Sequence, residues 1–391
     1  MTINSLPSSK KVKNFLSWIE IDSSALLENV ASFKKLIGSK VKFLAVVKSN
    51  AYGHGIVEVV QAIREKVDWF GVNSLDEAFT LKKNGIRKPI LILGYTQNSR
   101  LAEVVKNNFR QVVYNRQTGK QLLQNINILK SGKKIKIHLK IETGTNRQGV
   151  ENRELLEIAK ILTRNPKIEV EGAYTHFANA EESEDSSFPK EQIERFKRQL
   201  DFLEKSAVKV AIKHTACTAA TILLPKSYFD MVRLGVGLYG LWPSKLVKKL
   251  ANRKRAIFNL KPVLTWKTRV AQVKNVKKSE TIGYGRTYKV RKEMKIAILP
   301  IGYYEGYDRH LSNCGQVLVS GRFAPVVGRV MMNMTIVDIT HIPNVKVEDE
   351  IVLIGKQGKN EVTVEDLAEK ICTINYEVVA RINPFIPRIL V

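Results

Sequence analysis

The sequence predicts an α/β protein, a (β/α)8 TIM barrel followed by a mainly β C-terminal domain. Short apolar runs alternate with helical segments from about residue 42 to residue 239, and there are eight such runs. After residue 241 the pattern changes to strands separated by Gly, Asn and Pro. A chain of 391 residues also exceeds what one hydrophobic core usually organises. We therefore expect two domains, residues 1–241 and residues 242–391.

The barrel strands are expected where apolar and β-branched residues gather between turn residues. In chain order they are 43–47, 69–72, 90–93, 111–114, 135–141, 170–175, 209–215 and 231–238. Segments such as 155–163 and 192–205 place apolar residues three and four positions apart among charged residues. This spacing predicts the outer helices of the barrel.

The second domain is expected to contain mainly strands. Residues 242–262 include two prolines and a dense basic run, which predicts a linker or an irregular connection. Beyond them, strands are predicted at 264–273, 295–299, 316–319, 335–339 and 350–354, with one helix at about 364–371. The extended residues 17–21 could pair with either domain.

Composition narrows the class of protein. The net charge of +27 could favour the binding of nucleic acid or anionic ligands. The basic residues are, however, spread along the chain, with clusters at 10–13 and 248–255. No nucleic-acid-reading motif accompanies them, so a solvated basic surface is predicted. No apolar run approaches the ~20 residues of a membrane span, and no secretory signal is recognised. Three isolated cysteines suggest neither disulfides nor a metal site. We expect a cytoplasmic protein without a membrane or nucleic-acid partner.

Lys48 is the first catalytic candidate. It ends the first barrel strand in VVKSNAYGHG and is followed by a polar loop with glycines. Active sites of TIM barrels lie at the carboxyl-terminal ends of the strands, so a lysine leaving a buried strand there is suited to covalent catalysis. The alternative is a lysine whose charged end only extends from the barrel rim into water.

A phosphate site is predicted at the last two strands. The run MVRLGVGLYG holds Gly235, Gly237 and Gly240, which let the backbone approach a ligand closely. Thr218, after the seventh strand, can add a hydroxyl group. The glycines could instead serve close packing where the barrel closes. A lysine facing a phosphate site is the arrangement that pyridoxal 5′-phosphate (PLP) requires.

The sequence resembles the bacterial alanine racemases from Trp18 onward. The segment VVKSNAYGHG is similar to their PLP-lysine signature, and the likeness continues through HLKIETGTNRQG, YTHFA, HTACTAA, MVRLGVGLYG, IGYGRTY, LPIGYYEGYDR, VGRVMMNMT and INYEV. Several collinear motifs carry more weight than one short motif. The resemblance implies a PLP-dependent racemase that interconverts L-alanine and D-alanine and so supplies D-alanine for peptidoglycan.

The resemblance implies two catalytic bases. Lys48 matches the lysine that bonds PLP and removes the α-proton of the D-enantiomer, and Tyr284 matches the base that acts on the L-enantiomer. Two bases suit racemisation, because a proton leaves one face of the α-carbon and another arrives on the opposite face. A tyrosine with a pKa of about 10 needs neighbouring cations or donors to act as a base. His176 and Arg233 match the residues in that role.

Further roles are implied in the same way. Arg233 matches the arginine that faces the pyridine nitrogen, where related decarboxylases carry an acid. Arg147 matches the residue that holds the PLP phenolic oxygen and the substrate carboxylate, and Lys140 matches a carbamylated lysine that orients it. An unmodified strand lysine remains the alternative for Lys140. The residues that match contacts to the PLP phosphate are Tyr52, Thr218, Gly235, Val236 and Tyr376.

The second domain is implied to complete the site of a neighbouring subunit. It carries Tyr284, Tyr303 and Met332, so the resemblance implies a head-to-tail homodimer with composite sites. Aromatic residues in strands could also serve only packing. Other possibilities are a racemase for serine, lysine or arginine, a non-catalytic PLP carrier, and an RNA-associated protein suggested by charge alone.

Overall fold

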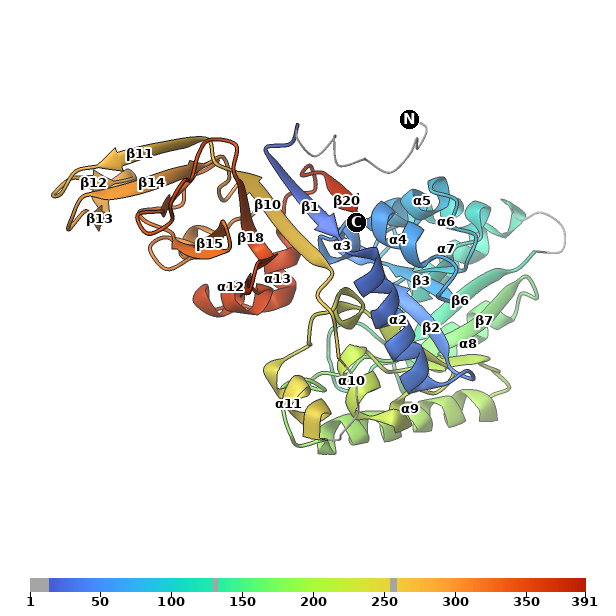
Figure 1. The fold of residues 1–391 in the computed structure, drawn as a ribbon. Coiled ribbons are helices and arrows are strands. Elements are labelled where there is room, and N and C mark those ends of the chain that lie inside the picture. The colour runs from blue at the N-terminus through green and yellow to red at the C-terminus, as the bar shows by residue number, and fades with distance from the viewer. Residues whose placement is uncertain (1–13, 129–132, 254–258) are drawn as a thin grey trace. The chain divides into compact units, whose positions relative to one another are not determined.

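The computed structural model describes residues 14–128, 133–253 and 259–391 (Figure 1). The chain forms two compact units. The barrel unit comprises Ala25–Ser49 and Val60–Lys261. The β unit comprises the described residues before Ala25, together with Asn50–Val59 and Pro262–Val391. The basic cluster 10–13 and the end of the cluster 248–255 lie outside the described residues.

Eight parallel strands form the sheet of the barrel unit, in the order β8-β7-β6-β5-β4-β3-β2-β9. They are β2 (Lys42–Val46), β3 (Trp69–Val72), β4 (Ile90–Ile92), β5 (Arg110–Val113), β6 (Ile135–Lys140), β7 (Ile168–Tyr174), β8 (Ile212–His214) and β9 (Met231–Leu234). The sheet is nearly closed, because the amide of Asp230 donates to the carbonyl of Lys213 and that of Arg233 to the carbonyl of Ala216, both at 2.9 Å. The predicted TIM barrel is confirmed.

Helices follow the strands along the chain. They are α2 (Ser23–Ile37), α3 (Lys48–Tyr52), α4 (Ile56–Ile63), α5 (Leu75–Lys83), α6 (Leu101–Asn107), α7 (Arg116–Gln124), α8 (Asn152–Thr163), α9 (Ser187–Lys205), α10 (Thr218–Leu223) and α11 (Lys245–Arg253). Short 3-10 turns are η1 (Asn98–Arg100), η2 (Ile126–Ile128), η3 (Pro225–Ser227) and η4 (Val236–Tyr239). Helix α8 shows why the spacing was informative: Leu155, Ile158, Ala159 and Leu162 are all buried on one face.

The connection after the barrel differs from the prediction. Residues 242–262 were expected to be irregular, but they contain helix α11. Val247 and Ala251, four positions apart, are buried, and the hydroxyl of Ser244 accepts from the amide of Val247 at 3.1 Å. A buried apolar stripe and a capping hydroxyl stabilise this helix despite its lysines.

The β unit contains three sheets. The largest has the order β16-β15-β18-β10-β1-β20, with β19 paired to β18; the others are β11-β14-β17 and β12-β13. The strands are β1 (Ser17–Ile21), β10 (Leu264–Arg269), β11 (Gln272–Val276), β12 (Thr281–Ile282), β13 (Tyr288–Lys289), β14 (Met294–Leu299), β15 (Gln316–Val319), β16 (Arg322–Pro325), β17 (Thr335–Asp338), β18 (Glu350–Gln357), β19 (Asn360–Val362) and β20 (Arg388–Leu390). The helices are η5 (Tyr284–Arg286), η6 (Arg309–Leu311), α12 (Val364–Lys370) and α13 (Asn375–Ala380).

Strand β1 lies between β10, to which it is antiparallel, and β20, to which it is parallel. Strand β10 alternates between buried and partly buried residues, as its sequence LTWKTR predicts for a strand with one covered face. The predicted strand 264–273 is divided, because β10 ends at Arg269 and β11 begins at Gln272.

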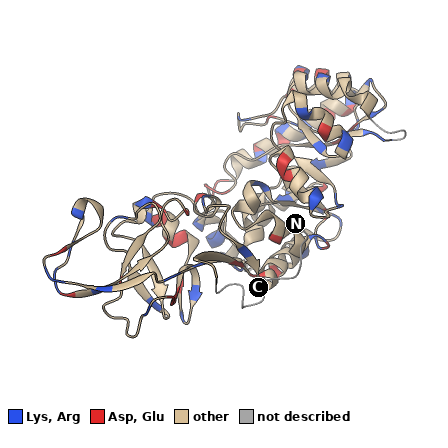
Figure 2. Ribbon diagram, turned by 90° about the horizontal axis from the view of Figure 1, so that it is seen from above, with Lys and Arg blue, Asp and Glu red and all other residues tan. Residues whose placement is uncertain are grey.

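Basic and acidic residues are scattered over the helices and strands of both units (Figure 2). Within residues 14–128, 133–253 and 259–391, no helix combines the length and apolar character needed to cross a membrane. The three cysteines form no disulfide.

Candidate active site

Lys48 lies two residues after the end of β2, at the carboxyl-terminal end of the barrel strands. Its side chain is half-buried. Burial and the positive charge of Arg147 lower the pKa of Lys48, while Glu77 opposes this shift. A lysine with a lowered pKa presents more of the neutral amine, which is the form that attacks a carbonyl group.

The turn that starts at Lys48 has an uncommon backbone. Residues 49–52 have φ angles of 55°, 53°, 53° and 53°, so helix α3 includes a left-handed turn built without glycine. Each such residue costs roughly 1–2 kcal/mol. The turn is held in place by the carboxylate of Glu77, which accepts from the amide of Ser49 at 2.6 Å, and by the Asn50 side chain, which accepts from the amide of Ile56 at 2.9 Å.

Within the β unit, this turn is anchored to the C-terminal segment. The Arg388 guanidinium donates to the carbonyl of Gly53 from Nε at 3.2 Å and from Nη2 at 2.9 Å. Gly53 has φ +82°, and a Cβ atom there would lie 1.8 Å from the carbonyl oxygen of Val379. The ring centroids of Tyr52 and Tyr376, both predicted phosphate contacts, lie 6.1 Å apart.

Several lysine, arginine and histidine side chains lie close together in the barrel. Lys140 is buried and donates to the side chain of Gln148 at 3.2 Å. Burial, followed by the charges of Arg147 and Arg233, lowers the pKa of Lys140 to about 8. Burial and the same two arginines hold the pKa of His176 well below its usual range. The structure therefore brings the predicted Lys48, Lys140, Arg147, His176 and Arg233 into one electrostatic group.

Arg233 is fixed by several acceptors. Its guanidinium donates to the carbonyls of Thr175 (2.7 Å), His214 (2.9 Å) and Thr215 (2.9 Å). Its Nη2 also lies 3.3 Å from Nδ1 of His176. Arginine has no acceptor, so Nδ1 of a neutral His176 accepts and its proton is on Nε2. His176 can thus donate a hydrogen bond from Nε2.

Thr218, Gly235 and Val236 lie together after the last two strands. The predicted strand 231–238 ends at Leu234, since Gly235 turns the chain (φ −106°, ψ −105°) into η4. The hydroxyl of Thr218 accepts from the amides of Gly235 (3.2 Å) and Gly237 (3.4 Å). A Cβ atom on Gly237 would lie 2.5 Å from Cγ2 of Thr218. Backbone amides at the start of such a turn, beside a hydroxyl group, fit a phosphate.

Cys217 directly precedes Thr218 in the chain. It is the N-cap of α10 but makes no side-chain cap hydrogen bond. Burial raises the pKa of its thiol, so this group stays protonated at neutral pH.

The β unit carries the other predicted site residues on loops. Tyr284 starts η5 between Gly283 and Gly285, both of positive φ, and is 72% exposed. The amide of Tyr303 donates to the carbonyl of Met331 at 3.0 Å, and this pairing places Tyr303 and Met332 on adjacent segments. Both side chains are exposed.

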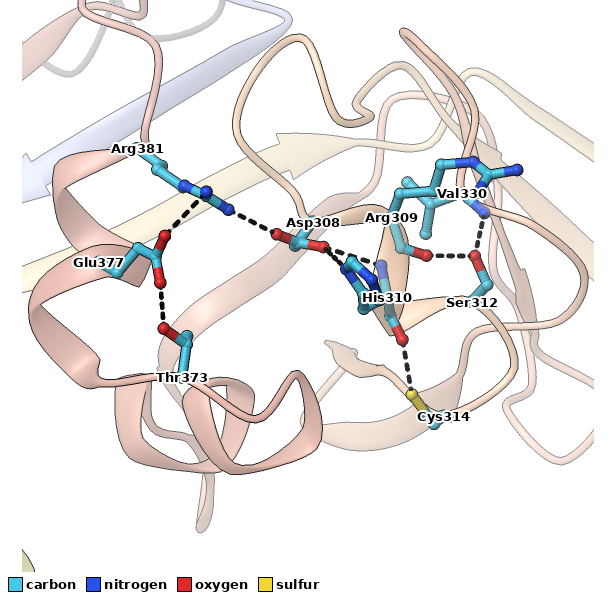
Figure 3. A network of polar contacts seen from close by, with 9 residues as sticks. All are labelled: Asp308, Arg309, His310, Ser312, Cys314, Val330, Thr373, Glu377 and Arg381. Atoms are coloured by element: carbon cyan, nitrogen blue, oxygen red, sulfur yellow. Dashed lines mark hydrogen bonds and ion pairs between the residues drawn. The ribbon is translucent and has the colours of Figure 1, made fainter.

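A polar network braces this part of the β unit (Figure 3). Arg381 bonds Asp308 through Nη1 at 3.2 Å and Glu377 through Nη2 at 2.8 Å. Glu377 accepts from the hydroxyl of Thr373, and Asp308 accepts from the amide of His310 at 2.8 Å. The network thus ties α13 to the segment that follows Tyr303.

The same network connects to a third segment, which contains Val330. The hydroxyl of Ser312 accepts from the amide of Val330 at 3.0 Å (Figure 3). Helix α13, which carries Tyr376, and the loops that carry Tyr303 and Met332 are therefore connected by side-chain hydrogen bonds and ion pairs within one unit.

Three buried polar residues next to this site were missed by the sequence reasoning. His138, Glu171 and His214 lie in strands that were recognised only as apolar runs. Their presence inside such strands was the available signal, since a buried polar side chain needs a partner.

The fold and the site together define a class of protein. A half-buried lysine at the end of a barrel strand, a hydroxyl group beside backbone amides and a fixed arginine suit a PLP-dependent enzyme of the TIM-barrel type.

Comparisons with known proteins identify the family. Residues 21–243 match the alanine racemase N-terminal domain, and residues 263–390 match the alanine racemase C-terminal domain. An alanine racemase of Halothermothrix orenii is 42% identical over 376 residues, covering 95% of this chain and 96% of that protein. A solved alanine racemase of Clostridium difficile is similar with a TM-score of 0.89 at 33% identity, covering 97% and 96% of the two chains. The chain belongs to the alanine racemase family.

The same fold occurs with another named substrate. A histidine racemase from Leuconostoc mesenteroides subsp. sake superposes with a TM-score of 0.86 at 28% identity, covering 97% of this chain and 98% of that one.

Proposed function

We propose that the protein is a PLP-dependent racemase that interconverts L-alanine and D-alanine, with Lys48 and Tyr284 as its two bases. The observation that carries the proposal is Lys48 itself, a half-buried lysine of lowered pKa at the end of a barrel strand. The family and the 42% identity to an alanine racemase support alanine as the substrate.

The described residues fit the proposed cofactor. Lys48 would bond its aldehyde carbon, Arg233 would face its ring nitrogen, and Thr218 with the amides of Gly235 and Val236 would hold its phosphate, joined by Tyr52 and Tyr376. When bound, PLP withdraws electrons from the α-carbon of the amino acid and so acidifies the α-hydrogen. Arg233 is always charged at neutral pH, and it disfavours protonation of the ring nitrogen, which suits proton exchange rather than decarboxylation.

The proton movements fall to side chains of this chain. Nζ of Lys48 removes and returns the α-proton on one face of the α-carbon. The Tyr284 phenol does so on the other face. The Nε2 proton of His176, placed there by Arg233, suits stabilisation of a phenolate.

Arg147 is proposed to bind the substrate carboxylate, with Tyr303 and Met332 next to the substrate and Tyr303 and Tyr376 at the entry. We also propose that Lys140 is carbamylated. A buried lysine with a pKa of about 8 presents a neutral amine to carbon dioxide more often than an ordinary lysine does.

We further propose that two copies form a head-to-tail homodimer in which Tyr284, Tyr303 and Met332 complete the partner's site. Their exposure suits an interface. The free cysteines suit a reducing, cytoplasmic location, from which the enzyme would supply D-alanine for peptidoglycan.

A racemase for a larger amino acid is the second candidate, as the similarity to a histidine racemase illustrates. Curated relatives that are 38–42% identical to this chain are named alanine racemases, which favours alanine. One assay decides between the two: each enantiomer of alanine, serine, lysine, arginine and histidine is incubated with the protein and PLP, and the products are separated by chiral chromatography. We expect alanine to be racemised fastest, and Lys48→Ala to be inactive. Faster turnover of another amino acid would overturn the assignment.

A further inference from the structure

Four buried polar side chains form a line inside the barrel, which we call the polar file. Nη1 of Arg233 lies 2.9 Å from Nδ1 of His214, and Nε2 of His214 lies 2.9 Å from Nδ1 of His138. Nε2 of His138 lies 3.5 Å from Oε2 of Glu171. No member is more than 6% exposed.

Arg233, at one end of the polar file, fixes the direction of its hydrogen bonds. Arginine can only donate, so Nδ1 of His214 accepts and the proton of a neutral His214 is on Nε2. That proton is donated to Nδ1 of His138, so the proton of His138 is on Nε2 and faces the Glu171 carboxylate. Burial lowers the pKa of both histidines, most strongly for His214, and this supports the neutral form of both rings.

The far end of the polar file carries a fixed negative charge. Glu171 accepts from Nε of Arg110 at 3.1 Å and from Nζ of Lys136 at 2.8 Å. Burial alone would raise the pKa of Glu171, but the nearby side chains of His138, Lys136 and Arg110 outweigh it and lower the pKa to about 2.

The backbone is shaped around the His138 ring. A Cβ atom on Gly172 would lie 2.4 Å from Nδ1 of His138, so only glycine leaves room for the ring. The pairing of β6 with β7 also shifts register between Ile137 and His138. The register shift and the missing Cβ atom at Gly172 together indicate that the backbone is shaped to accommodate the histidine pair.

Arg233, at the other end of the polar file, is a buried cation that needs a negative charge to stabilise it. Every hydrogen-bond acceptor found for Arg233 in residues 14–128, 133–253 and 259–391 is a backbone carbonyl or an imidazole ring. A buried cation without a direct carboxylate partner is costly. Hydrogen-bonded chains polarise one another, so Glu171 can stabilise the guanidinium through the two rings.

We propose that His138 and Glu171 are positioning residues, which act through His214 to fix the orientation of Arg233 and, through Arg233, the proton position of His176. The inference deepens the proposed function and rests on it for the role of Arg233. Neither residue contacts the amino acid or the cofactor in the proposed site.

The test compares two replacements of His138 in the full-length protein. His138→Gln can accept from His214 and donate to Glu171, whereas His138→Leu has similar volume and can do neither. With ¹⁵N-labelled histidine, NMR of the unmodified protein should show His214 with unprotonated Nδ1 and protonated Nε2 from pH 6 to 9. His138→Gln should keep this pattern and His138→Leu should lose it. The exposed His341→Leu is the matched control and should leave His214 unchanged.

Kinetics and PLP affinity give independent readouts. Because small displacements in an active site can cost about 10²-fold in rate, His138→Leu should lose about 10- to 100-fold in kcat with little change in KM, and His138→Gln should restore most of it. PLP should bind His138→Leu more weakly. If His138→Leu does not fold, Glu171→Gln replaces it in the test, because glutamine has nearly the same shape as glutamate. This variant should shift the Nε2 signal of His138 and lower kcat.

Failure of the positioning role can be distinguished from failure of the proposed function. Unchanged His214 signals and equal kcat in His138→Leu and His138→Gln, or no effect of Glu171→Gln, would overturn the positioning role. An unmodified protein that does not racemise alanine would overturn the proposed function, whatever the NMR signals show.

Discussion

The two proposed bases have different surroundings. Lys48 is half-buried and its pKa is lowered, whereas Tyr284 is 72% exposed on a loop between two glycines. A lysine with a lowered pKa is neutral more often than an ordinary lysine and so acts more readily as a base. An exposed tyrosine gains a comparable setting only when other groups cover it, which is why the proposed function includes a partner subunit.

Tyr284→Phe should therefore affect the two enantiomers unequally. The variant keeps Lys48, so slow exchange of the α-hydrogen of D-alanine with solvent deuterium should persist, while exchange from L-alanine and complete racemisation should fall by about 10² to 10⁴. NMR detection of deuterium uptake, started separately from each enantiomer, measures both. Equal losses from both enantiomers would contradict the two-base assignment.

Glu171 should make stability depend on acidity. Its pKa in the folded protein is about 2 instead of 4.5, so the ionised carboxylate stabilises the fold above about pH 4.5, and this contribution is lost as the pH falls toward 2. The difference corresponds to roughly 3 kcal/mol. Glu171→Gln should lower the free energy of unfolding in urea at pH 7, and the gap should shrink at pH 3.

The neighbouring Glu169→Gln serves as the control for that measurement. Glu169 is more exposed and lies 3.8 Å from Lys136, so its replacement should have little effect at either pH. A gap for Glu171→Gln that stays constant with pH would show that the carboxylate charge is not the cause.

At the scale of elements, the left-handed turn after β2 illustrates strain held by neighbours. The turn is unfavourable for non-glycine residues, and its end is fixed by Arg388 and by the close approach of Gly53 to Val379. Strain at a functional site persists only where surrounding contacts outweigh it, and here those contacts include the hydrogen bond from Ser49 to Glu77 and the contacts of Gly53 with Arg388 and Val379.

Gly53→Ala should weaken PLP binding, and Gly38→Ala should not. Both glycines have positive φ, +82° and +76°, but a Cβ atom at Gly38 would meet nothing within 4 Å. Gly38→Ala should cost about 1 kcal/mol of stability from backbone conformation alone. Gly53→Ala should in addition displace the turn and raise the PLP dissociation constant by about tenfold or more. Similar dissociation constants for the two variants would argue that the turn is not held at Gly53.

At the scale of the whole molecule, the proposed assembly divides each site between chains. Mixing inactive Lys48→Ala with inactive Tyr284→Phe subunits under exchange conditions should restore activity, because one of the two hybrid sites would carry both bases. Mass spectrometry of differently labelled subunits establishes the exchange. Persistent inactivity after proven exchange would place both bases of a site in one chain.

The sequence by itself determined the barrel, the mainly β second domain and the family. Periods of two and 3.6 residues, the eight apolar runs and the motif around Lys48 depend on neighbours along the chain, so they can be read without coordinates. Tertiary structure decided the rest. Arg388 bonds Gly53 across 335 positions, and His138 meets His214 and Glu171 because β6, β7 and β8 lie side by side in the sheet. Helix α11 exists because Val247 and Ala251 are buried. Such contacts depend on which surfaces meet, and a linear pattern of residue types does not contain that information.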